Sequence, residues 1–206
     1  MAERTLSQSG ATPDPARGGG ARRSSREAFI ATTARLLRRQ GYAATGLSEI
    51  VTASGAPRGS LYFHFPGGKE ELASAAIERS GAELTVAIEG VLASEPRLGA
   101  ALGLLVDALA VGLERSGYAD GCPVATAALE ASACAPSVLA AAQGAFDAWL
   151  GALERRMVAG GLAPAQAQRR AVLVLCAIEG ALLLSRTRRD ATALMQVREE
   201  LLALPW

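Results

Sequence analysis

One stretch of the chain contains helix-breaking residues that follow one another so closely that only short helices fit between them. Gly41 and Gly55 stand where a predicted helix ends, and Pro57 stands where a first-turn proline is tolerated. The spacing predicts two short helices, at residues 47–53 and 58–64. Together with a longer helix before Gly41, they are typical of a tri-helical DNA-binding unit.

The rest of the chain also favours helix. Ala and Leu dominate, aromatic residues make up 4% of the 206 residues, and β-branched residues rarely cluster. The first helix is expected to begin at a serine cap, Ser24 or Ser25, and to end at Gln40. We therefore predict an all-α fold with further helices at about 69–92, 97–116, 124–133, 137–159, 164–188 and 191–203.

Composition divides the chain into three parts. Residues 1–23 are rich in Gly, Pro, Ser and Thr and are predicted to form a disordered basic tail, whose arginines either follow a DNA groove or are simply solvated. Residues 24–69 form the predicted helix-turn-helix domain. Residues 70–206 form a predicted helical bundle for ligand binding and dimerisation.

Charge is distributed unevenly between the two ends. Residues 1–69 carry ten Lys or Arg against four Asp or Glu, a net of +6, whereas residues 70–206 carry eleven against sixteen, a net of −5. Such a split would orient the molecule with its basic end on a polyanion. The alternative is a chance imbalance on solvated faces.

Several classes of protein are disfavoured. Cys122, Cys134 and Cys176 form no CxxC pair and have one histidine, His64, as a possible co-ligand, so we expect no metal site and no cofactor. An enzyme with a cysteine nucleophile would lack a histidine base outside the DNA-binding unit. The N-terminus has no signal-peptide core and no apolar run is long enough to span a bilayer, so we expect a cytoplasmic protein with reduced thiols and no membrane contact.

Residues 41–72, GYAATGLSEIVTASGAPRGSLYFHFPGGKEEL, resemble the DNA-binding signature of the TetR family. The match consists of an ordered set of residues at the family's spacing: Gly41, Tyr42, Thr45, Ile50, Gly55, Gly59, Leu61, Tyr62, His64, Phe65, Lys69, Glu70 and Leu72. The wording ATGL and APRGSLYFHFPGGKEEL, together with GCPVA at residues 121–125, is similar to the LmrA/YxaF-like branch.

The third predicted helix presents small and polar groups at its N-terminal end, where a recognition helix meets base edges. Arg58 is the candidate for direct readout, because a guanidinium donates two hydrogen bonds to guanine. Gly59 and Ser60 allow a close approach, and the Ser60 hydroxyl can bond a base or a phosphate. Tyr62 and His64 are interpreted as clamps on the DNA backbone, with packing as the alternative for His64.

Two further phosphate contacts are expected. Lys69 lies at the start of the long helix, where the helix dipole already favours an anion. Thr45 is a clamp candidate from the family pattern. At Gly46 the chain departs from the family, in which Ser or Thr commonly caps the second helix, so one side-chain phosphate contact is missing there.

The predicted helix 164–188 is apolar nearly all round between residues 171 and 184, so it has to be buried on every side. Pairing it with the last helix across a two-fold axis would make a four-helix bundle between two copies, as the TetR resemblance also implies. The alternative is burial within one chain. The candidate interface residues are Leu173, Ala177, Gly180, Ala181 and Leu184.

The resemblance implies a ligand cavity in the second domain and an apolar or aromatic effector. Phe146 and Trp149 lie three apart on one helix, which fits a ligand wall or ordinary core packing. Buried carboxylates interrupting apolar stretches need a partner, which can be an arginine, a water or a ligand. The candidate ligand residues are Asp107, Cys122, Glu130, Phe146, Trp149 and Glu179.

The sequence thus predicts a transcriptional repressor that binds a palindromic operator as a homodimer and leaves it when a small molecule binds. The long helix after Lys69 would pivot and spread the two DNA-binding units. The alternative is an architectural or ligand-independent DNA-binding protein.

Overall fold

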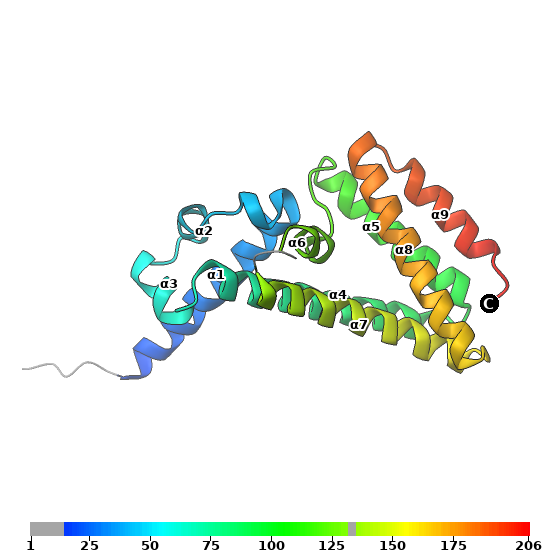
Figure 1. Ribbon diagram of the computed structural model, residues 1–206, viewed down its shortest axis with the longest axis horizontal. Helices are drawn as coiled ribbons and strands as arrows, with labels where there is room; N and C mark the ends of the chain where they lie inside the picture. The colour runs from blue at the N-terminus through cyan, green and yellow to red at the C-terminus, as the bar shows by residue number, and fades with distance from the viewer. Residues whose placement is uncertain (1–14, 132–134) are drawn as a thin grey trace, which may run out of the picture.

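The computed structural model describes residues 15–131 and 135–206, with side chains from Ser25 onward. This part of the chain is made of helices, without a strand, which confirms the all-α prediction (Figure 1). The helices are α1 (Pro15–Ala44), α2 (Leu47–Ser54), α3 (Arg58–His64), α4 (Lys69–Ser94), α5 (Leu98–Arg115), α6 (Pro123–Ala131), α7 (Pro136–Ala159), α8 (Pro164–Arg188) and α9 (Thr192–Ala203).

The first helix starts earlier than expected. It begins at Pro15, not at Ser24 or Ser25, so residues 15–23 are helical where a tail was expected, while residues 1–14 lie outside the described residues. Proline suits a first helical turn, which fits the start at Pro15, but Gly18, Gly19 and Gly20 are poor helix formers and helix propensity does not account for the extension. At Gly41 the backbone leaves helical geometry with φ +80°, as expected for a glycine there.

Glycine and proline punctuate the next two helices as predicted. Gly46 precedes α2 with extended backbone and makes no side-chain cap, and Gly55 ends α2 with φ +66°. Pro57, with φ −60°, precedes α3.

A small core holds these helices together. Phe29 and Leu37 of α1 meet Ile50 of α2, Leu61 of α3 and Phe65, all at most 1% exposed. The rings of Phe29 and Phe65 pack edge to face with centroids 6.5 Å apart. We call α1 to α3 with this core the head, and α4 to α9 the body.

The body is built around α4 and α7, which lie side by side along the molecule (Figure 1). They approach closely because small residues face each other: a Cβ at Gly81 of α4 would lie 2.6 Å from the Cβ of Ala145 of α7. The Trp149 indole N–H donates to the Gly81 carbonyl over 3.1 Å. Helices α5, α8 and α9 close the far end of the body (Figure 1). Since α4 starts at the head and ends in the body, it joins the two.

The head and body also touch beside α4. The Ala43 amide of the head donates to Glu130 of α6 over 2.6 Å, and the Gly121 amide donates to the Arg38 carbonyl over 2.9 Å. No helix in the described ranges is long and apolar enough to cross a membrane.

Candidate DNA-binding surface and ligand cavity

Helix α3 separates its buried and exposed faces sharply. Leu61 points into the head core, while Arg58 and Gly59 near its start are exposed. Tyr62 is 61% exposed. The side chains expected at base edges and phosphates therefore project from a helix that is fixed from behind by its own core.

Ser60 occupies the same surface with its hydroxyl already engaged. Its Oγ donates to the Pro57 carbonyl over 2.7 Å, within the first turn of the helix. The oxygen can still accept a hydrogen bond from a base amino group, because a hydroxyl both donates and accepts.

Phe63 belongs to this surface and was not among the predicted residues. It is 65% exposed, an unusual position for a large aromatic ring. The spacing contained the signal, because Leu61 and Phe65 share the inward face and a residue midway between them has to point outward. An exposed ring here suits apolar contact with a thymine methyl group.

His64 sits between two aromatic rings. It packs edge to face with Phe63 and Phe65, at centroid distances of 5.1 and 6.4 Å. Its Nε2 atom is shielded from solvent and has no hydrogen-bond partner among the described residues. This environment favours the packing interpretation of His64 over the phosphate clamp.

The two remaining predicted phosphate contacts, Lys69 and Thr45, differ in their exposure. Lys69 is partly exposed, and its Nζ lies 3.3 Å from the Ala43 carbonyl and 4.4 Å from the Tyr42 ring centroid, which holds the ammonium beside the head. Thr45 is 1% exposed, and its hydroxyl donates to the Gly41 carbonyl over 2.6 Å. Thr45 is thus a buried residue that closes the turn after α1, and the expectation of a phosphate contact there was wrong.

The body contains a cavity of about 430 Å³. Helices α4, α5, α7 and α8, the loop before α6 and the start of α6 line it, together with Arg38 of α1, and its wall is mainly aliphatic. The apolar lining includes Leu84, Ile88, Leu109, Leu153, Leu175 and Ile178. A cavity of this size and character fits a small apolar molecule.

Three of the six predicted ligand residues line this cavity: Cys122, Trp149 and Glu179. Burial raises the pKa of the Cys122 thiol, and the neighbouring Glu179 carboxylate raises it further, so the thiol stays protonated. Burial also raises the pKa of Glu179, against the opposing effect of its hydrogen bond with Cys122. A protonated thiol is a poor nucleophile.

The other three predicted ligand residues lie elsewhere. Asp107 turns toward α9 and pairs with Arg198 over 2.7 Å. Glu130 accepts the Ala43 amide at the contact with the head. Phe146 packs edge to face on Trp149 with centroids 5.4 Å apart and does not line the cavity. None of these three lines the cavity: helical periodicity showed that each interrupts or extends an apolar stripe, but not which neighbour it faces.

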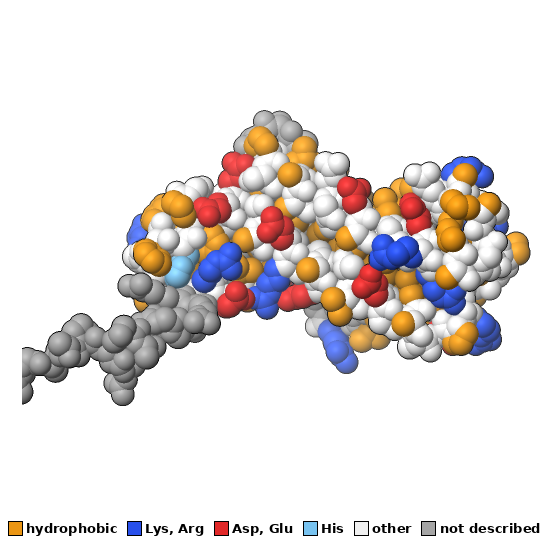
Figure 2. Space-filling view, turned by 90° about the horizontal axis from the view of Figure 1, so that it is seen from below, with side chains coloured by type: hydrophobic (Ala, Val, Ile, Leu, Met, Phe, Trp, Pro, Cys, Tyr) orange, Lys and Arg blue, Asp and Glu red, His pale blue; other side chains and the backbone are white. Residues whose placement is uncertain are grey.

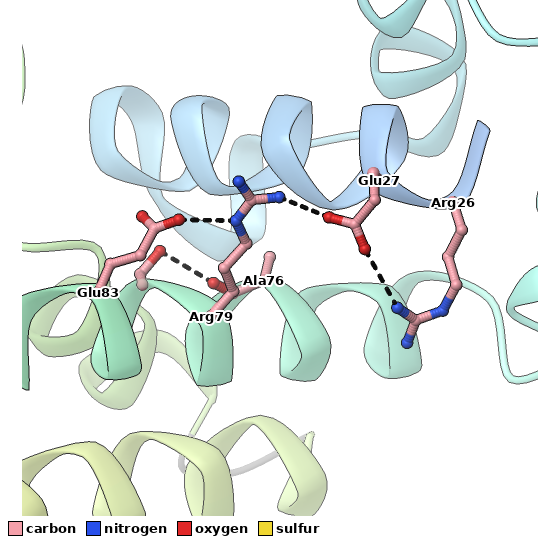
Figure 3. A network of polar contacts seen from close by, with 6 residues as sticks. Arg26, Glu27, Ala76, Arg79 and Glu83 are labelled. Carbon is pink, nitrogen blue, oxygen red and sulfur yellow. Dashed lines mark hydrogen bonds and ion pairs between the residues drawn. The ribbon is translucent and has the colours of Figure 1, made fainter. Parts of the chain in front are cut away.

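A chain of ion pairs connects the cavity wall with the head (Figure 3). Glu83 of α4 lines the cavity and accepts from Arg79 Nε over 2.8 Å. The same guanidinium donates to Glu27 of α1, also over 2.8 Å. Figure 2 shows acidic and basic side chains interspersed along the middle of one face of the molecule. Sequence spacing indicates the pair four residues apart within α4, but not the partner in α1.

Helix α8 is only half covered by its own chain. Ala171, Val174 and Ala181 are buried, which removes Ala181 from the predicted dimer surface. On the other side, Leu173 is 60% and Leu184 47% exposed, Ala177 is partly exposed, and Gly180 has open space beside it. Val172 and Leu183 extend this uncovered apolar face.

Cys176 lies on this face as well, whereas Cys134 falls outside the described residues. Within the described ranges, no group of three or more His, Cys, Asp or Glu side chains could hold a metal ion.

Comparison with known families matches both parts of the chain. Residues 29–76 match the model for bacterial regulatory proteins of the tetR family, and residues 99–200 match the C-terminal domain of LmrA/YxaF-like transcriptional regulators. The solved structure of a regulatory protein TetR from Rhodobacter sphaeroides superposes with a TM-score of 0.77 at 23% identity, covering 86% of this chain and 96% of that one. It supports the fold.

Sequence relatives are closer. The chain is 36% identical to an HTH-type transcriptional regulator of Mycobacterium tuberculosis, over 85% of this chain and 91% of that one. It is 33% identical to YxaF of Bacillus subtilis, over 87% and 94%, and 31% identical to LmrA of the same organism, over 84% and 92%. These relatives are transcriptional regulators and not enzymes, as predicted for this chain. The head has an exposed α3 on a packed core, the body matches the LmrA/YxaF-like domain, and these relatives share up to 36% identity over most of the chain. The chain therefore belongs to the TetR family of DNA-binding transcriptional regulators.

Proposed function

We propose that this regulator is an effector-responsive repressor. Two copies pair through α8 and α9, place their α3 helices in successive major grooves of a palindromic operator, and release the DNA when a small apolar or aromatic molecule fills the body cavity. The observation that carries the proposal is that one helix, α4, both lines the cavity and begins at the head.

The uncovered face of α8 supports pairing. Leu173, Leu183 and Leu184 are each between 47% and 63% exposed on one helix, and such a contiguous apolar strip marks an interaction surface. A two-fold axis lets the same strip cover itself. Two α3 helices held about 34–36 Å apart would then read one face of the duplex, one half-site each.

The route from cavity to head supports the response. A molecule in the cavity contacts Glu83, whose ion pair with Arg79 continues to Glu27 on α1. The Gly121 amide, on the cavity loop, also donates to the Arg38 carbonyl of the head. An effector that prefers a displaced α4 therefore changes the position of the head and lowers operator affinity.

Selection of binding sites from random DNA tests operator binding. A screen of apolar compounds for release of the selected DNA then tests the effector response. We expect a palindromic site protected by a dimer, and compounds that weaken binding to it. Because coupling free energy is reciprocal, operator DNA should weaken binding of such a compound by the same factor.

Isothermal titration with and without operator measures that factor. A compound affinity unchanged by operator would overturn the effector response. Uniform, salt-sensitive binding to all DNA, without a selected site, would instead identify a ligand-independent architectural protein.

A further inference from the structure

The charges around the cavity are mostly negative. Glu83, Asp120 and Glu179 belong to its lining, against one basic residue, Arg38, which is exposed. Glu83 is paired with Arg79. Neither Asp120 nor Glu179 forms an ion pair with a basic side chain in the described part of the molecule.

Glu179 is a partly buried carboxyl group among apolar neighbours. It lies on α8 beside Ile178, Leu175 and Leu182, which line the same cavity. Its contact is the thiol of Cys122, a weak donor. Burial penalises its charged form and raises its pKa, so a positive group brought next to it would restore favourable ionisation.

We propose that the effector is a cationic amphiphile, with an apolar body that fills the cavity and a protonated amine that binds the Glu179 carboxylate. This inference rests on the proposed effector response and specifies the ligand class of the same cavity. The amine donates a charge-assisted hydrogen bond, while Asp120 adds to the negative field at the wall.

Other ligand charges fit this wall less well. An anion would meet three carboxyl groups and gain one exposed arginine. A neutral molecule would cover Glu179 and remove water from it while supplying at most a neutral hydrogen-bond donor, which compensates a carboxylate less than an ammonium group does. Among ligands of one shape, the cavity should therefore bind the cation with the highest affinity.

Three pyrene derivatives of similar size provide the probes: 1-pyrenemethylamine, which is cationic at pH 7, neutral 1-pyrenemethanol, and anionic 1-pyrenecarboxylate. Their binding to the full-length protein without DNA is followed by probe fluorescence. We expect the cation to bind about tenfold or more tightly than the alcohol, as a charge-assisted hydrogen bond implies, and the carboxylate to bind weakest.

The decisive variant is Glu179→Gln, which keeps the shape of the side chain and removes its charge. It should lower cation affinity to that of the alcohol and leave alcohol binding unchanged. The control is Glu89→Gln, which removes a carboxylate from another helix of the cavity wall, α4, where Glu89 pairs with Arg155 and does not line the cavity. Glu89→Gln should keep the preference for the cation.

Equal affinity of the wild-type protein for cation and alcohol would overturn the inference, even if Glu179→Gln failed to fold. A cation preference that persists in folded Glu179→Gln, or absence of binding by all three probes, would overturn it as well. A separate titration with selected operator DNA tests the response itself. Charge-ranked binding without DNA release would contradict the proposed repressor mechanism while supporting the ligand class.

Discussion

The head and the body use their interiors in opposite ways. In the head, a compact core of large side chains such as Phe29 and Phe65 is filled, and the candidate functional groups project outward from α3. In the body, many of the buried residues are alanines, helices such as α4 and α7 approach closely at Gly81, and the candidate functional surface is an internal cavity. A filled core makes a rigid platform for a DNA surface, whereas a hollow bundle can change shape when it is occupied.

Two aromatic residues close in sequence, Phe65 and Phe63, provide the strongest test of the filled core of the head. Phe65→Ala should destabilise the protein by about 3–5 kcal/mol, because Phe65 is 1% exposed and packs on Phe29. Phe63→Ala, two positions earlier, removes a 65% exposed ring and should leave stability nearly unchanged while it weakens DNA binding. Urea unfolding at fixed protein concentration measures both variants. Equal stability losses would mean that α3 has no separate exposed face.

The second test asks whether the body supplies the pairing that the head requires. Leu173→Glu places a charge on the exposed strip of α8 and should convert the dimer to monomers. Operator affinity should then fall by about a hundredfold or more, because the two half-sites no longer bind as one unit. Leu129→Glu, at an 81% exposed site on α6, is the matched control. Sedimentation that shows the Leu173 variant still dimeric would exclude α8 as the interface.

Sequence reasoning located the short helices of the head because glycine and proline determine where helices end and begin. Gly41, Gly55 and Pro57 fix where short helices end and begin, and Leu61 four residues before Phe65 fixes which side of α3 faces inward. The same reasoning placed Thr45 on the surface, because a family pattern does not distinguish a hydroxyl that closes a turn from one that faces DNA.

In the body, periodicity located the helices but not the contacts between them. Pro164–Arg188 has the predicted bounds, and Glu179 and Trp149 do face the cavity. Asp107 and Phe146 have equally suggestive positions along their helices, yet they face α9 and Trp149. Whether such a side chain faces the cavity or another helix depends on how its helix is rotated and on residues distant in sequence, such as Arg198. The cavity is a property of the packing, and no single segment encodes it.

A third pair of variants separates direct readout of bases from binding of phosphates on the DNA-binding surface. Arg58→Ala should lose about 1–3 kcal/mol of discrimination at one base pair, because the exposed guanidinium is the candidate for direct readout. Lys69→Ala should weaken all sequences alike and reduce the slope of log affinity against log salt by about 0.9, as expected for one lost phosphate contact. Binding to single-base variants of the operator, measured over a range of salt concentrations, distinguishes the two. Identical effects would contradict the division of roles.

The smallest expected change in stability concerns the ion pairs of Arg79, which link the head to the body. Arg79→Gln should change stability by less than about 1 kcal/mol, because Arg79 and both its partners are more than one third exposed and water screens such pairs. Its effect should appear in coupling: operator DNA should weaken effector binding by a smaller factor than in the wild-type protein.

Arg155→Gln is the control for Arg79→Gln, since it breaks an exposed pair with Glu89 between α7 and α4 that does not reach the head. Titration of effector with and without operator should then give reduced coupling for Arg79→Gln and unchanged coupling for Arg155→Gln. Equal coupling in both variants would mean that the cavity acts on the head through its other contacts, which include α4, the Gly121 amide and Arg38 at the cavity wall. The ion pairs of Glu27, Arg79 and Glu83 would then fasten the head to α4 without transmitting the state of the cavity.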